Sequence, residues 1–137
     1  MNSINIKNTD EIIREFKQKN VKSGYIQARV TADGGKTPLP SAKVTVYRLF
    51  GDEEYIFKTL YTTESGNTEI IPLPAPDIRY PRQNESEASD LYVIYEIKAE
   101  HEGYETAICE EVPVYEGVTS FQQLNLTLNL TAVTPVT

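Results

Sequence analysis

The chain has a single histidine, His101, and a single cysteine, Cys109, and these are the side chains best suited to acid–base or nucleophilic chemistry near neutral pH. A zinc site needs three or four converging ligands, and no spacing in the sequence brings carboxylates to this pair. Glu110 and Glu111 follow the cysteine directly, and negative neighbours raise the pKa of a thiol. We therefore predict that His101 lies in a solvated turn and that Cys109 packs as a small apolar side chain.

Carboxylates are far more numerous, and they fall into short runs at residues 52–54, 85–90 and 110–111. Such runs could hold Ca²⁺ or supply an acid–base pair. None has the alternating spacing of a calcium loop, and charge runs in loops are commonly solvated. The sequence also lacks the Gly-x-Ser-x-Gly turn of a serine hydrolase, and Gly34-Gly35 lacks the full pattern and the strand-to-helix context of a phosphate loop. We predict no catalytic residue, no metal site and no cofactor.

One group of residues is suited to contact with another molecule: Arg79, Tyr80 and Arg82, in a proline-rich segment at residues 72–90. Tyrosine and arginine are enriched at protein interfaces. These three residues form a basic and aromatic island on a chain whose net charge is −7. The segment could alternatively lie across a sheet edge and block pairing with another chain, and the sequence leaves both interpretations open.

The overall charge bears on the class of partner. Proteins that bind nucleic acid or anionic membranes use clustered lysine and arginine, and here the basic residues are scattered and outnumbered. We therefore expect neither nucleic acid nor a membrane as partner. No signal peptide is visible in the sequence, so we expect a protein that is cytoplasmic as synthesised.

The elements that must position these residues are mostly strands. Apolar and polar residues alternate at 24–30, at 42–47 and at 123–130, where Leu124, Leu126, Leu128 and Leu130 should all face a shared interior. Residues 10–19 have helical spacing, capped by Asn8, Thr9 or Asp10, and this helix should dock on the sandwich or on a partner. Prolines in 72–90 exclude a central strand there.

The fold class expected from these patterns is all-β, a sandwich of about seven strands in an antiparallel Greek-key arrangement, with a short N-terminal helix. The expected organisation is an arm at residues 1–22, the sandwich at 23–130 and a flexible tail at 131–137.

Several motifs in this order resemble a known family. They are the glycine-led strand at 24–30, the Pro-Leu and alternating run at 38–46, the turn around Gly66, the strand at 92–99, Glu102-Gly103-Tyr104, and residues 112–120. Over residues 23–130 the chain resembles the carboxypeptidase regulatory-like domain, which has a transthyretin-like (prealbumin-like) β-sandwich. The second half is most similar to the version found in clostridial spore cortex-lytic enzyme precursors and similar Firmicutes cell-wall proteins.

The resemblance implies a non-catalytic accessory module that associates with a protein or cell-wall partner, with a link to the spore or cell envelope. A second hypothesis is a self-assembling coat or appendage protein, a homo-oligomer built through the N-terminal arm or an edge strand. A third is a transthyretin-like hydrolase. Hydrolases of that kind are similar to one another in using several histidines and arginines, so a chain with one histidine fits that class poorly.

Overall fold

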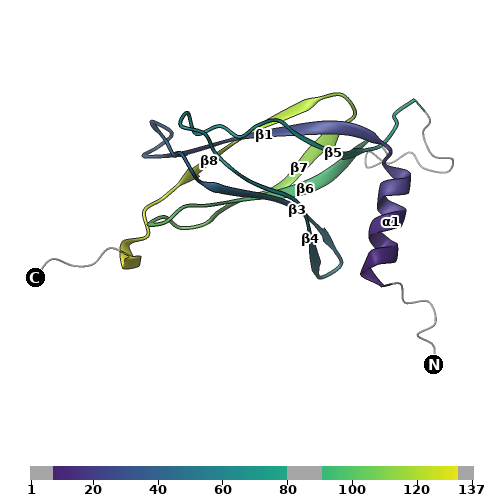
Figure 1. Cartoon of the computed structure of the whole chain (residues 1–137), viewed down its shortest axis with the longest axis horizontal. Helices are drawn as coiled ribbons and strands as arrows, with labels where there is room; N and C mark the ends of the chain where they lie inside the picture. Colours follow the sequence, from purple (N-terminus) through teal and green to yellow (C-terminus); the bar gives the residue numbers. More distant parts are fainter. Residues whose placement is uncertain (1–7, 80–90, 133–137) are drawn as a thin grey trace, which may run out of the picture.

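The computed structural model describes residues 8–79 and 91–132 of the chain (Figure 1). Within these residues there are one α-helix, eight strands and a short 3₁₀ helix. Their bounds are α1 (Thr9–Lys19), β1 (Lys22–Ala32), β2 (Thr37–Pro38), β3 (Lys43–Phe50), β4 (Glu53–Tyr61), β5 (Ile71–Ala75), β6 (Tyr92–Glu100), β7 (Ala107–Tyr115), β8 (Thr119–Leu126) and the 3₁₀ helix Leu130–Ala132.

The strands form two sheets packed face to face. In the first sheet β1 is central: β2 and β5 pair with one of its edges and β8 pairs with the other. The second sheet has the order β4-β3-β6-β7, with every neighbouring pair antiparallel. The predicted all-β sandwich with a short N-terminal helix is therefore confirmed. One pair departs from the antiparallel pattern, because β8 runs parallel to β1.

The core lies between the sheets and follows the predicted alternation. Ile26, Ala28 and Val30 of β1, and Val44 and Val46 of β3, are fully buried. Each inward side chain removed from water stabilises the fold by roughly 25 cal/mol per Å² of apolar surface. The chain has only one cysteine, so this burial, without any internal disulfide, holds the two sheets together.

The prediction that four leucines face the interior is correct for only two of them. Leu124 and Leu126 are buried, but Leu128 is 56% exposed and Leu130 is 75% exposed. The strand ends at Leu126, and the following backbone bonds to the loop between β6 and β7 instead: Glu105 N–H donates to the carbonyl of Thr127 over 2.8 Å. The alternation continues along the chain, but the opposite sheet no longer lies beneath it.

The predicted helix is present and begins with a capping box. The Asn8 side chain accepts a hydrogen bond from the backbone N–H of Glu11 over 2.8 Å, and the Glu11 carboxylate accepts one from the N–H of Asn8. These bonds satisfy donors that a helix start leaves unpaired. Ile13 and Phe16 are the buried residues of the helix. Of the two alternatives left open by the sequence, α1 docks on its own sandwich.

Phe16 anchors the helix in a cluster of aromatic rings. Its ring centroid lies 5.2 Å from that of Phe50, 5.8 Å from Phe57 and 6.5 Å from Tyr95. The guanidinium of Arg48 lies over the Phe16 and Phe50 rings, at 4.8 and 4.9 Å from their centroids. Burial lowers the pKa of Arg48 below its ordinary value. Figure 1 shows α1 beside the sheets at the end of the molecule where β4 and β5 lie, so the helix covers one end of the core.

The outermost strands β4 and β5 carry features that oppose pairing with another chain. β5 contains Pro72 and Pro74, which lack N–H donors, and it pairs only with β1 at the edge of its sheet. β4 places Lys58 opposite the inward-facing Val46, and a bulge follows directly after this pair. The prediction that the proline-rich segment is not a central strand is confirmed, although its first residues form β5 rather than a connection. Residues 80–90 lie outside the described part of the chain.

Gly24 permits the closest approach between the sheets. A Cβ at this position would collide with the backbone carbonyl of Tyr115 and with the Val114 side chain of β7. Only glycine fits such a contact. The glycine that leads the first strand is therefore required by packing between β1 and β7.

Candidate functional site

His101 is held by backbone carbonyls in the turn after β6. Its Nε2 lies 3.1 Å from the carbonyl oxygen of Pro40, its Nδ1 lies 3.0 Å from that of Glu102, and its ring packs edge-on against Tyr104. The predicted turn is confirmed, but the ring is half-buried rather than fully solvated. The histidine joins the β6–β7 turn to the segment before β3, which is a structural contact.

Cys109 is half-buried on β7, and its Sγ lies 3.4 Å from Oε1 of Gln122 on β8. Burial raises the pKa of the Cys109 thiol, and the negative charge of Glu96 on β6 raises it further. The predicted direction is confirmed, but the cause is burial and a residue of the neighbouring strand rather than the adjacent glutamates. In the described residues, no three His, Cys, Asp or Glu side chains are grouped as they would be to hold a metal ion.

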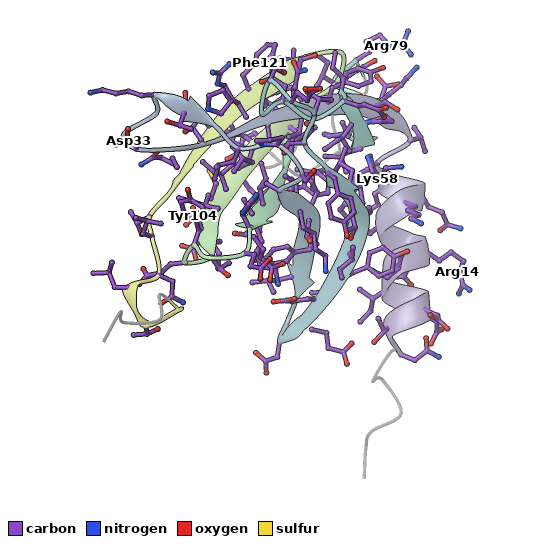
Figure 2. The ribbon with its side chains drawn as sticks, turned by 60° about the vertical axis from the view of Figure 1, so that its left-hand side comes forward. Arg14, Asp33, Lys58, Arg79, Tyr104 and Phe121 are labelled. Atoms are coloured by element: carbon purple, nitrogen blue, oxygen red, sulfur yellow. The ribbon has the colours of Figure 1, made fainter. Side chains whose placement is uncertain are left out.

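Arg79 is engaged by a carboxylate two residues before it in the chain. Its Nε lies 3.2 Å from Oδ1 of Asp77 and its Nη2 lies 3.1 Å from Oδ2, which makes a bidentate pair. Arg79 itself lies at the surface of the molecule (Figure 2). This hydrogen bonding lowers the pKa of Asp77 and raises that of Arg79. The other two residues of the predicted island, Tyr80 and Arg82, lie outside the described residues. The contact surface at 79–82 therefore stays a prediction.

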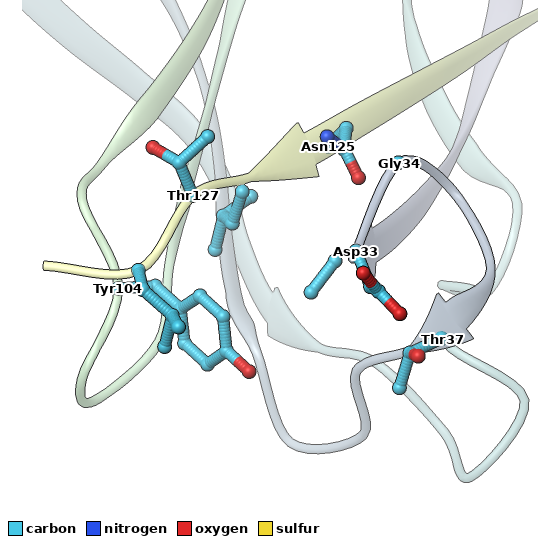
Figure 3. Close-up of a pocket in the computed structure, with 9 residues that line it drawn as sticks. Asp33, Gly34, Thr37, Tyr104, Asn125 and Thr127 are labelled. Atoms are coloured by element: carbon cyan, nitrogen blue, oxygen red, sulfur yellow. The ribbon is translucent and has the colours of Figure 1, made fainter.

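A hollow of about 330 Å³ lies at the end of the sandwich where β8 ends, between β1 and the loop that carries Tyr104 (Figure 3). Its apolar floor includes Leu126 and Leu128, and polar groups of Asp33, Tyr104 and Asn125 surround it. Asp33 is the single carboxylate among its lining residues. Its lining therefore lacks the paired carboxylates of a glycosidase site.

The outer face of the first sheet has a different composition from the rest of the surface. Side chains that point inward and outward alternate along β1 and β8. Residues that are paired across these two strands point to the same side of the sheet, so every second pair lies on the outer face. We call the outward set the Phe121 face; it consists of Tyr25, Gln27 and Arg29 of β1 and Thr119, Phe121, Gln123 and Asn125 of β8, while Thr31, in the same phase, is buried. No residue in this set is acidic, in a chain of net charge −7.

Phe121 is the most exposed aromatic side chain of the described residues, with 71% of its surface open to solvent. The other phenylalanines, Phe16, Phe50 and Phe57, all belong to the cluster under α1. Sequence reasoning missed Phe121, yet a signal was present. Phe121 shares the phase of Gln123 and Asn125, the polar side of an amphipathic strand, where a large apolar ring is unexpected.

The amide side chains around this ring are held in place by hydrogen bonds. Nε2 of Gln27 donates to the carbonyl of Thr68 over 2.9 Å, and Nε2 of Gln123 donates to Oγ1 of Thr31 over 3.2 Å. Oδ1 of Asn125 accepts from the backbone N–H of Gly35 over 2.9 Å. Each amide thus uses part of its bonding capacity to fix its position and keeps the remainder for another molecule.

Arg29 lies beside Phe121 on this face, and together with Gln27, Asn67 and Gln123 it lines a shallow hollow of about 390 Å³. Among the described residues, no carboxylate forms an ion pair with Arg29. A guanidinium prefers a planar anion, which it binds through two parallel hydrogen bonds. The Phe121 face therefore combines an exposed ring, oriented amides and a cation.

The outer face of the second sheet offers a contrast. Ile56, Tyr61 and Ile108 are exposed there, and carboxylates such as Glu96 and Glu100 share the face. That face mixes aliphatic side chains with both charges, since Lys43 and Lys98 lie there too, whereas the Phe121 face carries amides, hydroxyls and one arginine. The two faces are therefore suited to different kinds of contact.

Comparison with known proteins bears on the fold. No family model matches the chain, and no curated protein matches it. Among solved structures, 3-chlorocatechol 1,2-dioxygenase from Rhodococcus opacus 1CP is 11% identical with a TM-score of 0.51, and the match covers 79% of this chain and 61% of that one. The TIE protein of Bacillus anthracis is 16% identical with a TM-score of 0.47, covering 78% of this chain and 17% of that one. The minor pilin GBS52 of Streptococcus agalactiae is 15% identical with a TM-score of 0.47, covering 85% and 49%.

These likenesses concern architecture. The chain spans less than two thirds of the length of each of these proteins. At 11% identity the likeness to the dioxygenase concerns the fold alone and says nothing of a shared activity. Among the described residues, the single helix is too short and too polar to cross a membrane. The fold is a two-sheet β-sandwich with one short N-terminal helix.

Proposed function

We propose that this chain is a non-catalytic binding module that acts by surface contact, and that the Phe121 face is its contact surface. One observation carries the proposal: a phenylalanine that is 71% exposed on a rigid strand, between oriented amides and an arginine. Aromatic residues and arginine are the usual centres of binding energy at interfaces. Their position on paired strands means that little conformational freedom is lost on binding.

The resemblance to carboxypeptidase regulatory-like domains of cell-wall proteins belongs to the same proposal. A sandwich of this type accompanies other activities in that family, and we propose that this one associates with a protein or cell-wall component at the spore or cell envelope. The segment with Arg79 is a secondary contact in this proposal, because the Arg79 guanidinium is already paired with the Asp77 carboxylate.

The test compares three variants with the unaltered chain in binding to cell-envelope material from the source organism. Phe121→Ser and Arg29→Ala should each reduce the bound fraction. Tyr61→Ser is the matched control, because Tyr61 is 61% exposed but lies on the other sheet. Equal loss in the control, or no loss in Phe121→Ser, would contradict the proposal.

A self-assembling structural role is a second candidate, favoured by the exposure of Leu128 and Leu130 beside the hollow at the end of the sandwich. Two neighbouring exposed leucines are suited to burial against another copy. Light scattering would then show a multimer that Leu128→Ser and Leu130→Ser together convert to monomer. A monomer in the unaltered chain would eliminate this candidate.

A further inference from the structure

The chemistry of the Phe121 face also indicates what it binds. The ring of Phe121 stands clear of the sheet, and a π-face attracts the partial positive charge of C–H groups. The flat side of a pyranose ring presents a row of such groups. An exposed ring on a flat strand surface is therefore a platform on which a sugar ring can stack.

The amides supply what the rest of a sugar requires. Each hydroxyl group of a sugar is both a donor and an acceptor, and an amide side chain offers both functions. Gln27 and Gln123 use their nitrogen atoms internally, which leaves their carbonyl oxygens as acceptors, whereas Asn125 uses its oxygen, which leaves its nitrogen as a donor. The face thus presents acceptors and donors at fixed positions around the ring.

Arg29 favours a ligand that carries negative charge. Arg29 and Phe121 line the same shallow hollow, and no outward residue of β1 or β8 on this face is acidic. A carboxylate on the ligand would pair with this cation through two hydrogen bonds.

A protein partner fits this face less well. Fully buried centres of protein interfaces are rich in apolar side chains, whereas the Phe121 face surrounds a single phenylalanine with amides and hydroxyls. The aliphatic residues that a protein interface favours, such as Ile56 and Ile108, lie on the other sheet.

We infer that the Phe121 face binds a polysaccharide strand whose pyranose rings carry carboxylates, with one ring stacked on Phe121 and a carboxylate on Arg29. This inference rests on the proposed function, because it names the ligand of the same surface.

Three soluble probes separate the parts of the inference: a hyaluronan hexasaccharide, which has pyranose rings and carboxylates; chitohexaose, which has N-acetylated pyranose rings without carboxylates; and poly-L-glutamate, which has carboxylates without rings. Binding is measured by titration calorimetry with the full chain. Side-chain amide signals of Gln27, Gln123 and Asn125 in NMR spectra report where the probe lies.

The hyaluronan hexasaccharide should bind most tightly, chitohexaose more weakly and poly-L-glutamate not at all, with amide shifts confined to the Phe121 face. Phe121→Ala should weaken binding of both saccharides by about tenfold. Arg29→Gln should remove the difference between the two saccharides by weakening hyaluronan binding more than chitohexaose binding. Tyr61→Ala should change neither.

Two results would overturn the inference. One is binding of poly-L-glutamate as tight as that of the hyaluronan hexasaccharide, which would make the face a general anion site. The other is the absence of saccharide binding while Phe121→Ser still abolishes capture of envelope material, which would point to a protein ligand and leave the proposed function standing. If Phe121→Ser leaves that capture intact, the proposed function fails as well.

Discussion

Replacing Phe16 by alanine tests how the helix is attached to the sandwich. Phe16 is only 8% exposed, and its neighbours Phe50, Phe57 and Tyr95 surround it. A buried phenylalanine covers about 150–250 Å², which at roughly 25 cal/mol per Å² corresponds to about 4–6 kcal/mol. Truncation of core phenylalanines costs about 3–5 kcal/mol, and we expect a loss in that range as the upper limit.

The free energy with which α1 docks on the sandwich limits how much stability the variant can lose. An eleven-residue helix such as α1 is marginal in isolation, so it should separate from the sandwich once the cost of the cavity exceeds the free energy of docking. The loss in Phe16→Ala should therefore be accompanied by weaker far-UV helical signal and by rapid hydrogen exchange of the amides in α1. Urea unfolding measures the loss of stability, and hydrogen exchange shows whether the amides that lose protection are those of α1.

Phe121→Ala is the matched control because it makes the same chemical change at a side chain that is 71% exposed. Its cost should stay within about 0.5 kcal/mol. The reasoning would be refuted if the two variants lost equal stability, or if Phe16→Ala lost less than about 1 kcal/mol with the α1 amides still protected.

Three further predictions concern the packing of the sheets. Gly24→Ala should destabilise the fold by at least about 1–3 kcal/mol in urea unfolding, because the new methyl group meets the backbone carbonyl of Tyr115; an unchanged midpoint would contradict this contact. Tyr95→Phe should cost about 1–3 kcal/mol, because its hydroxyl donates to the carbonyl of Pro74 over 2.6 Å and that oxygen would lose its donor; a neutral effect would show that water replaces the hydroxyl. Burial raises the pKa of the Cys109 thiol, so alkylation by iodoacetamide should be slower than that of free cysteine and its rate should rise at a higher pH; a rate profile that matches free cysteine would refute the shift.

Local patterns in the sequence were sufficient for the elements. Alternation at 24–30 and at 42–47 identified inward residues that are fully buried, since successive residues of a strand point to opposite faces. The candidate caps Asn8, Thr9 and Asp10 and the spacing of Ile13 and Phe16 identified the helix, because both signals involve residues within one or two turns; the structure selects Asn8 as the cap. The fold class followed from these elements.

Contacts that no repeating pattern in the sequence specifies could not be obtained in this way. The pairing of Arg79 with Asp77 is close in sequence, yet two residues do not meet on a regular element, and only the turn brings them together. The pKa of Cys109 depends on Glu96, which lies on the strand paired with β7. Neither contact leaves a periodic signal.

The four leucines near the C-terminus show where the boundary lies. Their spacing in the sequence determined that Leu124, Leu126, Leu128 and Leu130 would share one side of an extended chain, because that geometry is local. Whether anything covers that side was decided by the tertiary structure: β1 ends at Ala32 and the chain beyond Leu126 leaves the sheet, so the last two leucines face solvent. In the same way the sequence placed Phe121 in a polar phase, but only the packing of the sheets left that face open, and an apolar side chain contributes to binding only where the fold leaves it uncovered.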